Sequence, residues 1–307
     1  MLELYRAIWQ MTGRRQTVLI VISAAVAALA AVPLEFQKNI VNALTEGDVA
    51  ARQLLLLGAG MMTAILLSLG LKFLMGYLAS TLGEDTIRRL RRRLLDRAEE
   101  DRATEERKGT LATAISAEAE ELGKFVGSAF SQPVMQLGTL ISVVGYISTT
   151  QPRLGLIALA MILPQIAIVV ISQRMVNVFV SERVKILRQS NDCLTEARVA
   201  EVEDEVRAHF DEIYETRRRM FLCKLSAKFM LSAINGIGTV AVLMLGGWLV
   251  LNGRTDVGTV VAATTGLTRI QGPTGFLIAF YRQVSATRIK FELLREVFGA
   301  VPKRPDR

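Results

Sequence analysis

Residues able to carry out catalysis are few in this chain of 307 residues. The sequence holds one histidine, His209, and two cysteines, Cys193 and Cys223. Neither cysteine has the neighbours of a metal site, and a single histidine gives little support to a Ser-His-Asp triad or a His-rich metal centre. His209 is more simply explained as a surface residue. The residue types therefore predict no catalytic site and no metal site.

The pair Gly123-Lys124 comes closest to a nucleotide-binding loop. The P-loop motif Gly-x-x-x-x-Gly-Lys-Ser/Thr requires a hydroxyl after the lysine to bind Mg²⁺, and a glycine at its first position. Phe125 and Glu118 occupy those two positions. We therefore expect that this chain is not an enzyme, that it hydrolyses no ATP by a P-loop mechanism, and that it holds no cofactor of its own.

The strongest charge feature is "TIRRLRRRLLDRA", residues 86–98, which has six arginines among thirteen residues in a chain of formal net charge +8. A site for single-stranded nucleic acid would interleave aromatic residues with the basic ones, and none occurs here. Hydrophobic residues make up 51% of the chain, which favours lipid over nucleic acid. Two interpretations remain: the arginines bind lipid phosphates, or they anchor the topology on a solvated helix face.

Long uncharged runs recur along the whole sequence. A helix rising ~1.5 Å per residue needs about 20 apolar residues to cross the hydrocarbon layer of about 30 Å. Six segments approach or exceed that length, so the sequence predicts an all-α polytopic membrane protein rather than a soluble core of six helices without polar faces. The predicted spans are 16–34, 53–83, 125–151, 154–173, 229–252 and 257–281.

Basic residues are distributed unequally between alternate connections. The segments 84–124 and 174–228 carry ten and eleven of them. The three other connections carry only Lys38, Arg52, Arg153 and Arg254. The positive-inside rule therefore predicts a multi-pass protein of the plasma (bacterial inner) membrane with both termini in the cytoplasm. Both basic segments are predicted to form helical pairs that extend well beyond the bilayer.

A few polar groups interrupt the apolar runs. Arg269 lies about twelve residues into its span, where an arginine costs at least ~2.5 kcal/mol on insertion scales. It either attracts an anionic group of a substrate or pairs with a glutamine or carbonyl of another helix. Pro273 either permits the bend of a gate or makes a packing notch. Snorkelling explains Lys72, and a substrate role is its alternative. The pathway and gate candidates are Arg269, Gln271, Gly272, Pro273, Asn235, Gln132 and Gln136.

Several stretches together resemble the transmembrane domain of ATP-binding cassette (ABC) exporters. "LELYRAIWQMTGRRQTVLIVI" is similar to the family's interfacial elbow helix, and "VPLEFQKNIVNAL" to the outer end of its first span. "RKGTLATAISAEAEELGKFV" is similar to its first coupling helix. The most specific match is "DVGTVVAATTGLTRIQGPTGFLIAFYRQVSATRIKFELL", which resembles its sixth span. The resemblance covers nearly all of residues 1–300.

The resemblance implies two chains, identical or related, that form a twelve-helix pathway above two ATPase domains. ATP and Mg²⁺ would then be bound by the partner ATPase, whose surface would contact the two cytoplasmic tips. The second tip is shorter than usual, so its contact is in doubt. The implied coupling residues are Gly109, Thr110, Leu111, Ala112, Thr113, Ala114, Ile115 and Ser116 at the first tip, and Thr195, Glu196 and Ala200 at the second.

The sequence departs from the family pattern because it has no nucleotide-binding domain. It runs to a short tail, 301–307, where the family would begin a linker, so we expect the ATPase to be a separate polypeptide or to have been removed. The leading hypothesis is a permease subunit of an ATP-driven exporter. A non-transporting membrane scaffold or regulator with the same fold is the alternative, and an ion-coupled carrier is a third. The substrate is not defined by the sequence.

Overall fold

The computed structural model describes residues 2–47, 50–100, 119–196 and 199–299. Every element within these ranges is an α-helix, which confirms the predicted all-α class. The helices are α1 (Leu2–Ala28), α2 (Val32–Glu46), α3 (Ala51–Glu100), α5 (Ala119–Ser128), α6 (Ser131–Thr150), α7 (Pro152–Glu196), α8 (Val199–Leu251) and α9 (Val257–Gly299).

Within the described residues, four helical stretches are long and apolar enough to cross a membrane: Glu3–Glu46, Ala51–Arg93, Pro152–Leu187 and Val206–Leu251. The two other predicted spans correspond to α6 and α9, which are not among these stretches and which pack along one another. Several helices are much longer than a bilayer is thick. The 50 residues of α3 and the 53 residues of α8 correspond to about 75 and 80 Å.

Two of the predicted spans are interrupted. The segment 16–34 falls partly in α1 and partly in α2, with a turn at residues 29–31 between them. Pro33 stands in the first turn of α2, where its missing N–H costs nothing, and Gly47 ends α2 with φ 77°. The segment 125–151 is divided between α5 and α6 by a break at residues 129–130. Pro33 lies in the first turn of α2 and Pro133 in the first turn of α6. Both helices therefore begin inside segments that were predicted to be continuous spans.

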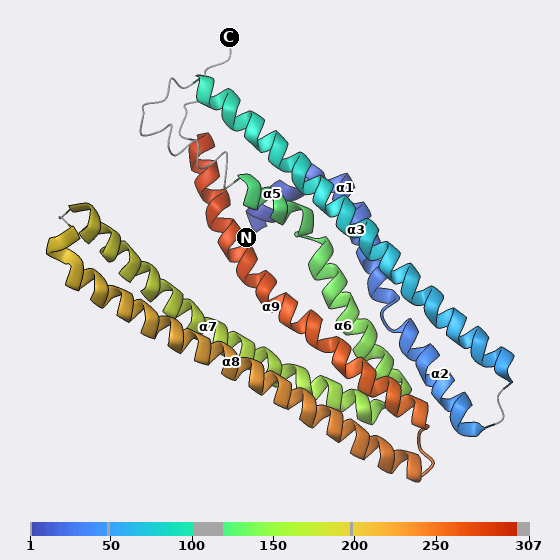
Figure 1. Cartoon of the computed structure of the whole chain (residues 1–307). Helices are drawn as coiled ribbons and strands as arrows, with labels where there is room; N and C mark the ends of the chain where they lie inside the picture. Colours follow the sequence, from blue (N-terminus) through green and yellow to red (C-terminus); the bar gives the residue numbers. More distant parts are fainter. Residues whose placement is uncertain (1, 48–49, 101–118, 197–198, 300–307) are drawn as a thin grey trace.

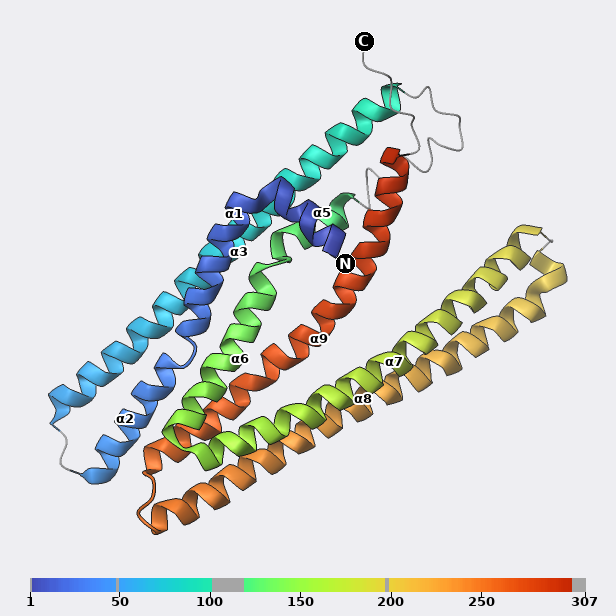
Figure 2. The ribbon, with the colours of Figure 1, turned by 180° about the vertical axis from the view of Figure 1, so that it is seen from behind.

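The molecule consists of a body and a long hairpin (Figures 1 and 2). The body contains α1, α2, α3, α5, α6 and α9. The hairpin is formed by α7 and α8, which lie against each other along their length and diverge from the body toward the tip. At the opposite end a buried cluster joins the hairpin to α2, α6 and α9. Its members include Leu34, Val143, Ile147, Leu154, Ala158, Val242, Leu249 and Val260.

Glycines set the closest helix contacts of the body. A Cβ on Gly127 of α5 would overlap the backbone carbonyl of Ala79 in α3, and one on Gly258 of α9 would overlap the carbonyl oxygen of Lys38 in α2. The sequence therefore permits α5 and α9 to approach their neighbours at backbone distance. These contacts fix the positions of α3 and α9, which both contribute charged residues to the site described next.

Candidate functional site: a basic cavity among five helices

A cavity of about 400 Å³ lies inside the body and receives side chains from α1, α2, α3, α6 and α9. Its only charged lining residues in the described part of the chain are Lys72 and Arg269. Its lining is Val26, Leu29, Ala30, Pro33, Ile65, Ser68, Leu69, Lys72, Met135, Gln136, Thr139, Arg269 and Pro273. The cavity is thus mainly apolar, with two cations and a few neutral polar groups.

Arg269 is half-buried and held by the break between α1 and α2. Its Nη1 donates a hydrogen bond to the carbonyl oxygen of Ala30, 3.1 Å away. The backbone N–H groups that close the break bond to the carbonyls of Leu29 and Ala31, so the carbonyl of Ala30 is left for the guanidinium. Of the two roles considered for Arg269, pairing with a carbonyl of another helix is therefore present.

The same guanidinium keeps donors for a ligand. An arginine carries five N–H donors in a planar fork, and the bond to Ala30 uses one of them. Within the described ranges no carboxylate forms an ion pair with Arg269. The bond to Ala30 orients the side chain. Because a carbonyl is neutral, the full positive charge of Arg269 stays at the cavity.

Pro273 lies one helical turn beyond Arg269 and is buried in the cavity wall. Because proline has no N–H, the backbone carbonyl of Arg269, four residues earlier, loses its helical partner. The helix α9 nevertheless continues through Pro273 to Gly299. The neighbouring Gly272 and Gly275 are exposed, with open space where a side chain would lie, so α9 meets no packed neighbour at these two glycines.

The side chain of Lys72 in α3 is exposed, which is compatible with the predicted snorkelling, and it also lines the cavity that Arg269 lines. It is the one charged residue in the run 53–83, and this isolated charge is the feature of the sequence that marks it as a candidate for the site. Counting residues along one helix gave its depth without its rotation about the helix axis. A second cation therefore joins Arg269 in the site.

The other pathway candidates lie in different places. Gln136 lines the cavity, whereas Gln271 is exposed on α9 and Gln132 is half-buried in the first turn of α6. Asn235 of α8 lies in the hairpin, where its Oδ1 accepts a hydrogen bond from Nε2 of Gln165 in α7 at 2.8 Å. The structure thus gives Asn235 a contact between the two hairpin helices rather than a place in the cavity.

The residues proposed for the first coupling contact, 109–116, lie outside the described residues. Those of the second are placed by the backbone: Thr195 and Glu196 end α7, and Ala200 follows the first residue of α8. The intervening residues 197–198 also lie outside the description. The three described positions are therefore at the tip of the hairpin (Figure 1).

The helix α5, which follows the first proposed coupling segment, is firmly attached to the body. Phe125 is fully buried, stacks on Phe280 of α9 at 5.8 Å between ring centroids, and meets the edge of Tyr5 in α1 at 6.3 Å. Leu4 and Ile8 belong to the same buried cluster. A displacement of α5 would therefore act on the first turns of α1 and on α9 around Phe280.

Charged side chains reinforce α5 at the end where it begins. Nζ of Lys124 donates a hydrogen bond to Oε1 of Glu120 at 2.6 Å, and Arg91 of α3 lies 3.4 Å from Oε2 of the same carboxylate. The hydrogen bond from Lys124 lowers the pKa of Glu120, and the same bond raises the pKa of Lys124. Both groups are therefore charged at neutral pH, and they link α3 to α5.

The helices, their apolar surfaces and the cavity between them define a helical integral membrane protein. Large apolar side chains are exposed on several helices, as in Phe73 of α3 and Phe229 of α8, which are 78% and 73% exposed and suit contact with lipid. Residues 17–274 match the family model described as the ABC transporter transmembrane region. The match covers more than half of the chain, which therefore belongs to this family. No curated protein matches the chain.

Proposed function

We propose that this chain is the permease subunit of an ATP-driven transporter of the exporter type, with six spans, and that the basic cavity is part of the substrate pathway. The observation that carries the proposal is the cavity itself: within a bundle of this family, Lys72 and Arg269 line one volume inside the helices. Cations that cost free energy in a membrane are usually retained for a ligand or a partner. The cavity therefore favours a substrate with an anionic or strongly accepting group.

The hairpin supports assembly as a dimer, of identical or related chains. It diverges from the body in both views (Figures 1 and 2), so toward the tip α7 and α8 pack mainly on each other within the described part of the chain. Large side chains such as Leu163, Val178 and Phe221 are exposed along it. A second chain would cover part of this surface, while lipid would cover the remainder. The proposed dimer would hold twelve helices around its pathway.

Coupling to a separate ATPase is assigned to the two tips, with both termini in the cytoplasm of a plasma or bacterial inner membrane. The long helices support this role because α3, α7 and α8 extend well beyond the bilayer and can transmit a displacement along their length. ATP and Mg²⁺ would be held by the ATPase. Its closure would move the tips together and favour the outward-open state, since the partner would bind the two states with different affinities.

The pathway is tested by replacing Arg269 in proteoliposomes that contain the chain and its ATPase. We expect Arg269→Gln to reduce uptake of anionic fluorescent amphiphiles more than that of neutral ones, while Arg269→Lys retains part of the preference. Arg282→Gln is the matched control, because it removes the same charge from an exposed position of the same helix. Equal uptake of both classes by wild type and Arg269→Gln would remove the cavity from the pathway.

Coupling is tested at the first tip. We expect Leu111→Asp or Ile115→Asp to abolish stimulation of a co-purified ATPase by substrate, whereas Leu95→Asp, at an exposed leucine of α3, preserves it. Full stimulation in the tip variants would contradict the contact assignment.

The alternative, a membrane scaffold or regulator without transport, is favoured by the short second tip. It predicts stoichiometric binding of a partner with no ATP-dependent uptake in any of the variants.

A further inference from the structure

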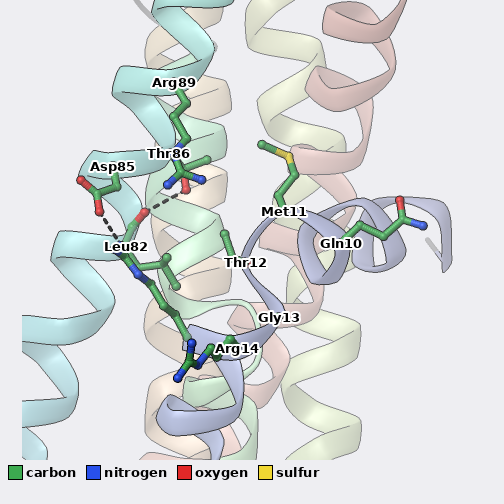
Figure 3. Close-up of a pocket in the computed structure, with 10 residues that line it drawn as sticks. Gln10, Met11, Thr12, Gly13, Arg14, Leu82, Asp85, Thr86 and Arg89 are labelled. Atoms are coloured by element: carbon green, nitrogen blue, oxygen red, sulfur yellow. Dashed lines mark hydrogen bonds and ion pairs between the residues drawn. The ribbon is translucent and has the colours of Figure 1, made fainter.

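A second basic cavity lies away from the proposed pathway, where the middle of α1 meets α3. It has a volume of about 350 Å³ and is lined by residues 10–15 of α1 and by Leu82, Asp85, Thr86 and Arg89 of α3. In Figure 3 the bend of α1 around Met11–Gly13 faces α3 across this space. The predicted spans 16–34 and 53–83 each have one end beside it, so the cavity lies at the polar boundary of the membrane.

The cavity carries an excess of positive charge. Arg14, Arg15 and Arg89 line it with a single carboxylate, Asp85. Arg15 and Asp85 form an ion pair that ties α1 to α3, which neutralises one cation. For Arg14 and Arg89 the described residues supply no ion-pair partner. Three guanidinium groups therefore line one space with one carboxylate, whose charge also acts on Arg89. The excess of positive charge favours an anionic group such as a phosphate, which accepts hydrogen bonds from arginine.

An apolar groove continues from this cavity toward the hydrocarbon layer. An adjoining cavity of about 650 Å³ shares Arg14, Arg15 and Asp85 and extends along Val18 of α1 and Tyr77 of α3. Val18 and Tyr77 are 49% and 61% exposed, so their apolar surfaces are open to a chain lying between the helices. The two cavities together are basic at the membrane boundary and apolar below it.

The structure also separates the arginines of the basic run by their surroundings. Arg91 is paired with Glu120 and so belongs to the contact between α3 and α5. Arg89, Arg92 and Arg93 are all exposed, but of these three Arg89 alone lines the cavity. Of the two interpretations of this run, anchoring on a solvated face suits Arg92 and Arg93, and lipid binding suits Arg89.

We propose that this paired cavity is a binding site for an anionic phospholipid, with the phosphate between Arg14 and Arg89 and an acyl chain along Val18 and Tyr77. The ligand is a lipid rather than a free phosphate ester because the basic space opens directly into an apolar groove at membrane depth. The bound lipid would bridge α1 and α3 beside the ion pair of Arg15 and Asp85. The site does not depend on the proposed transport function.

The test uses the purified full chain in detergent, with native mass spectrometry to count bound lipids. The probes are phosphatidylglycerol, phosphatidylcholine and water-soluble glycerol phosphate. We expect wild type to prefer phosphatidylglycerol over phosphatidylcholine, and glycerol phosphate to compete weakly because it has no acyl chain. The double variant Arg14→Gln/Arg89→Gln should bind phosphatidylglycerol about thirty-fold more weakly, since each basic residue near an anionic surface contributes about fivefold.

The matched control is Arg92→Gln/Arg93→Gln, which removes the same charge from the same basic region outside the cavity. It should retain wild-type binding, and Arg14→Lys/Arg89→Lys should retain most of it, which separates loss of binding from loss of folding. An equal loss in the control would overturn the proposal in favour of a diffuse electrostatic surface. Competition by glycerol phosphate as strong as that by the lipid would overturn the lipid assignment, and equal affinity for phosphatidylcholine would overturn the role of the two arginines.

Discussion

Replacing Phe125 tests whether one buried ring holds α5 against the rest of the body. Phe125→Ala removes a side chain that is 0% exposed and that touches rings on α1 and α9. Truncations of buried phenylalanine cost about 3–5 kcal/mol, depending on how far the site can collapse. Three helices surround this ring, and aromatic pairs contribute about 0.5–1.5 kcal/mol beyond burial. We therefore expect a loss of about 4 kcal/mol in the free energy of unfolding.

The measurement is equilibrium unfolding in mixed micelles with an increasing fraction of sodium dodecyl sulfate, followed by tryptophan fluorescence. Trp9 reports on the same region, because its ring lies 5.6 Å from that of Phe130. Phe73→Ala is the control: it deletes the same ring from a side chain that is 78% exposed, and it should change stability by less than about 0.5 kcal/mol. An equal free energy of unfolding for the Phe125→Ala and Phe73→Ala variants, with unchanged Trp9 emission, would refute the role of the buried cluster around Phe125.

Three further substitutions test the helix contacts, each followed by unfolding in the same micelles. Gly127→Ala should destabilise by about 1–3 kcal/mol because its Cβ would overlap the carbonyl of Ala79; wild-type stability would contradict the close approach of α3 and α5. Asn235→Ala should cost about 0.5–1.5 kcal/mol, since it leaves the amide of Gln165 unpaired, whereas replacing both residues by leucine should cost less. Asp256→Ala should cost about 1 kcal/mol through loss of the N-cap of α9. Burial raises the pKa of Asp256, but hydrogen bonds from Asn42 and Thr259 outweigh burial and leave that pKa below its usual value. Its contribution is therefore present above the ordinary pKa of an aspartate and is lost as the pH falls through the lower pKa of the folded state. A difference between wild type and Asp256→Ala that does not decrease as the solution is acidified would contradict this account.

The fold class could be predicted because it follows from composition along the chain. Uncharged runs of spanning length can satisfy their backbone groups in a membrane only as helices or closed barrels, and the runs here lack strand alternation. The breaks at 29–31 and 129–130 could not be predicted in the same way. Pro33 and Pro133 are compatible both with the first turn of a new helix and with a kink inside a continuous one. Packing against neighbouring helices decides between these outcomes, and that packing cannot be inferred from the local sequence pattern.

The candidate site was partly predictable for a similar reason. An arginine in the middle of an apolar run is visible in the sequence, and so is the proline that follows it. The neighbours of Arg269 depend on how five helices are rotated about their own axes, which the sequence does not give. In the structure Lys72 lines the cavity and Asn235 does not. The carbonyl of Ala30 could not have been predicted as a partner, because it becomes available only through the turn between α1 and α2.

The helix α1 connects the two basic cavities. Near its middle, Arg15 pairs with Asp85 of α3 beside the lipid cavity, and at its far end the turn after Ala28 offers Ala30 to Arg269 of α9. Val26 lines the pathway cavity from the same helix. A rigid shift of α1 relative to α3 and α9 would therefore change the geometry of both cavities together. A phospholipid that stabilises the contact between α1 and α3 would bias that shift, so its effect on uptake should require Arg14 and Arg89 as well as Arg269.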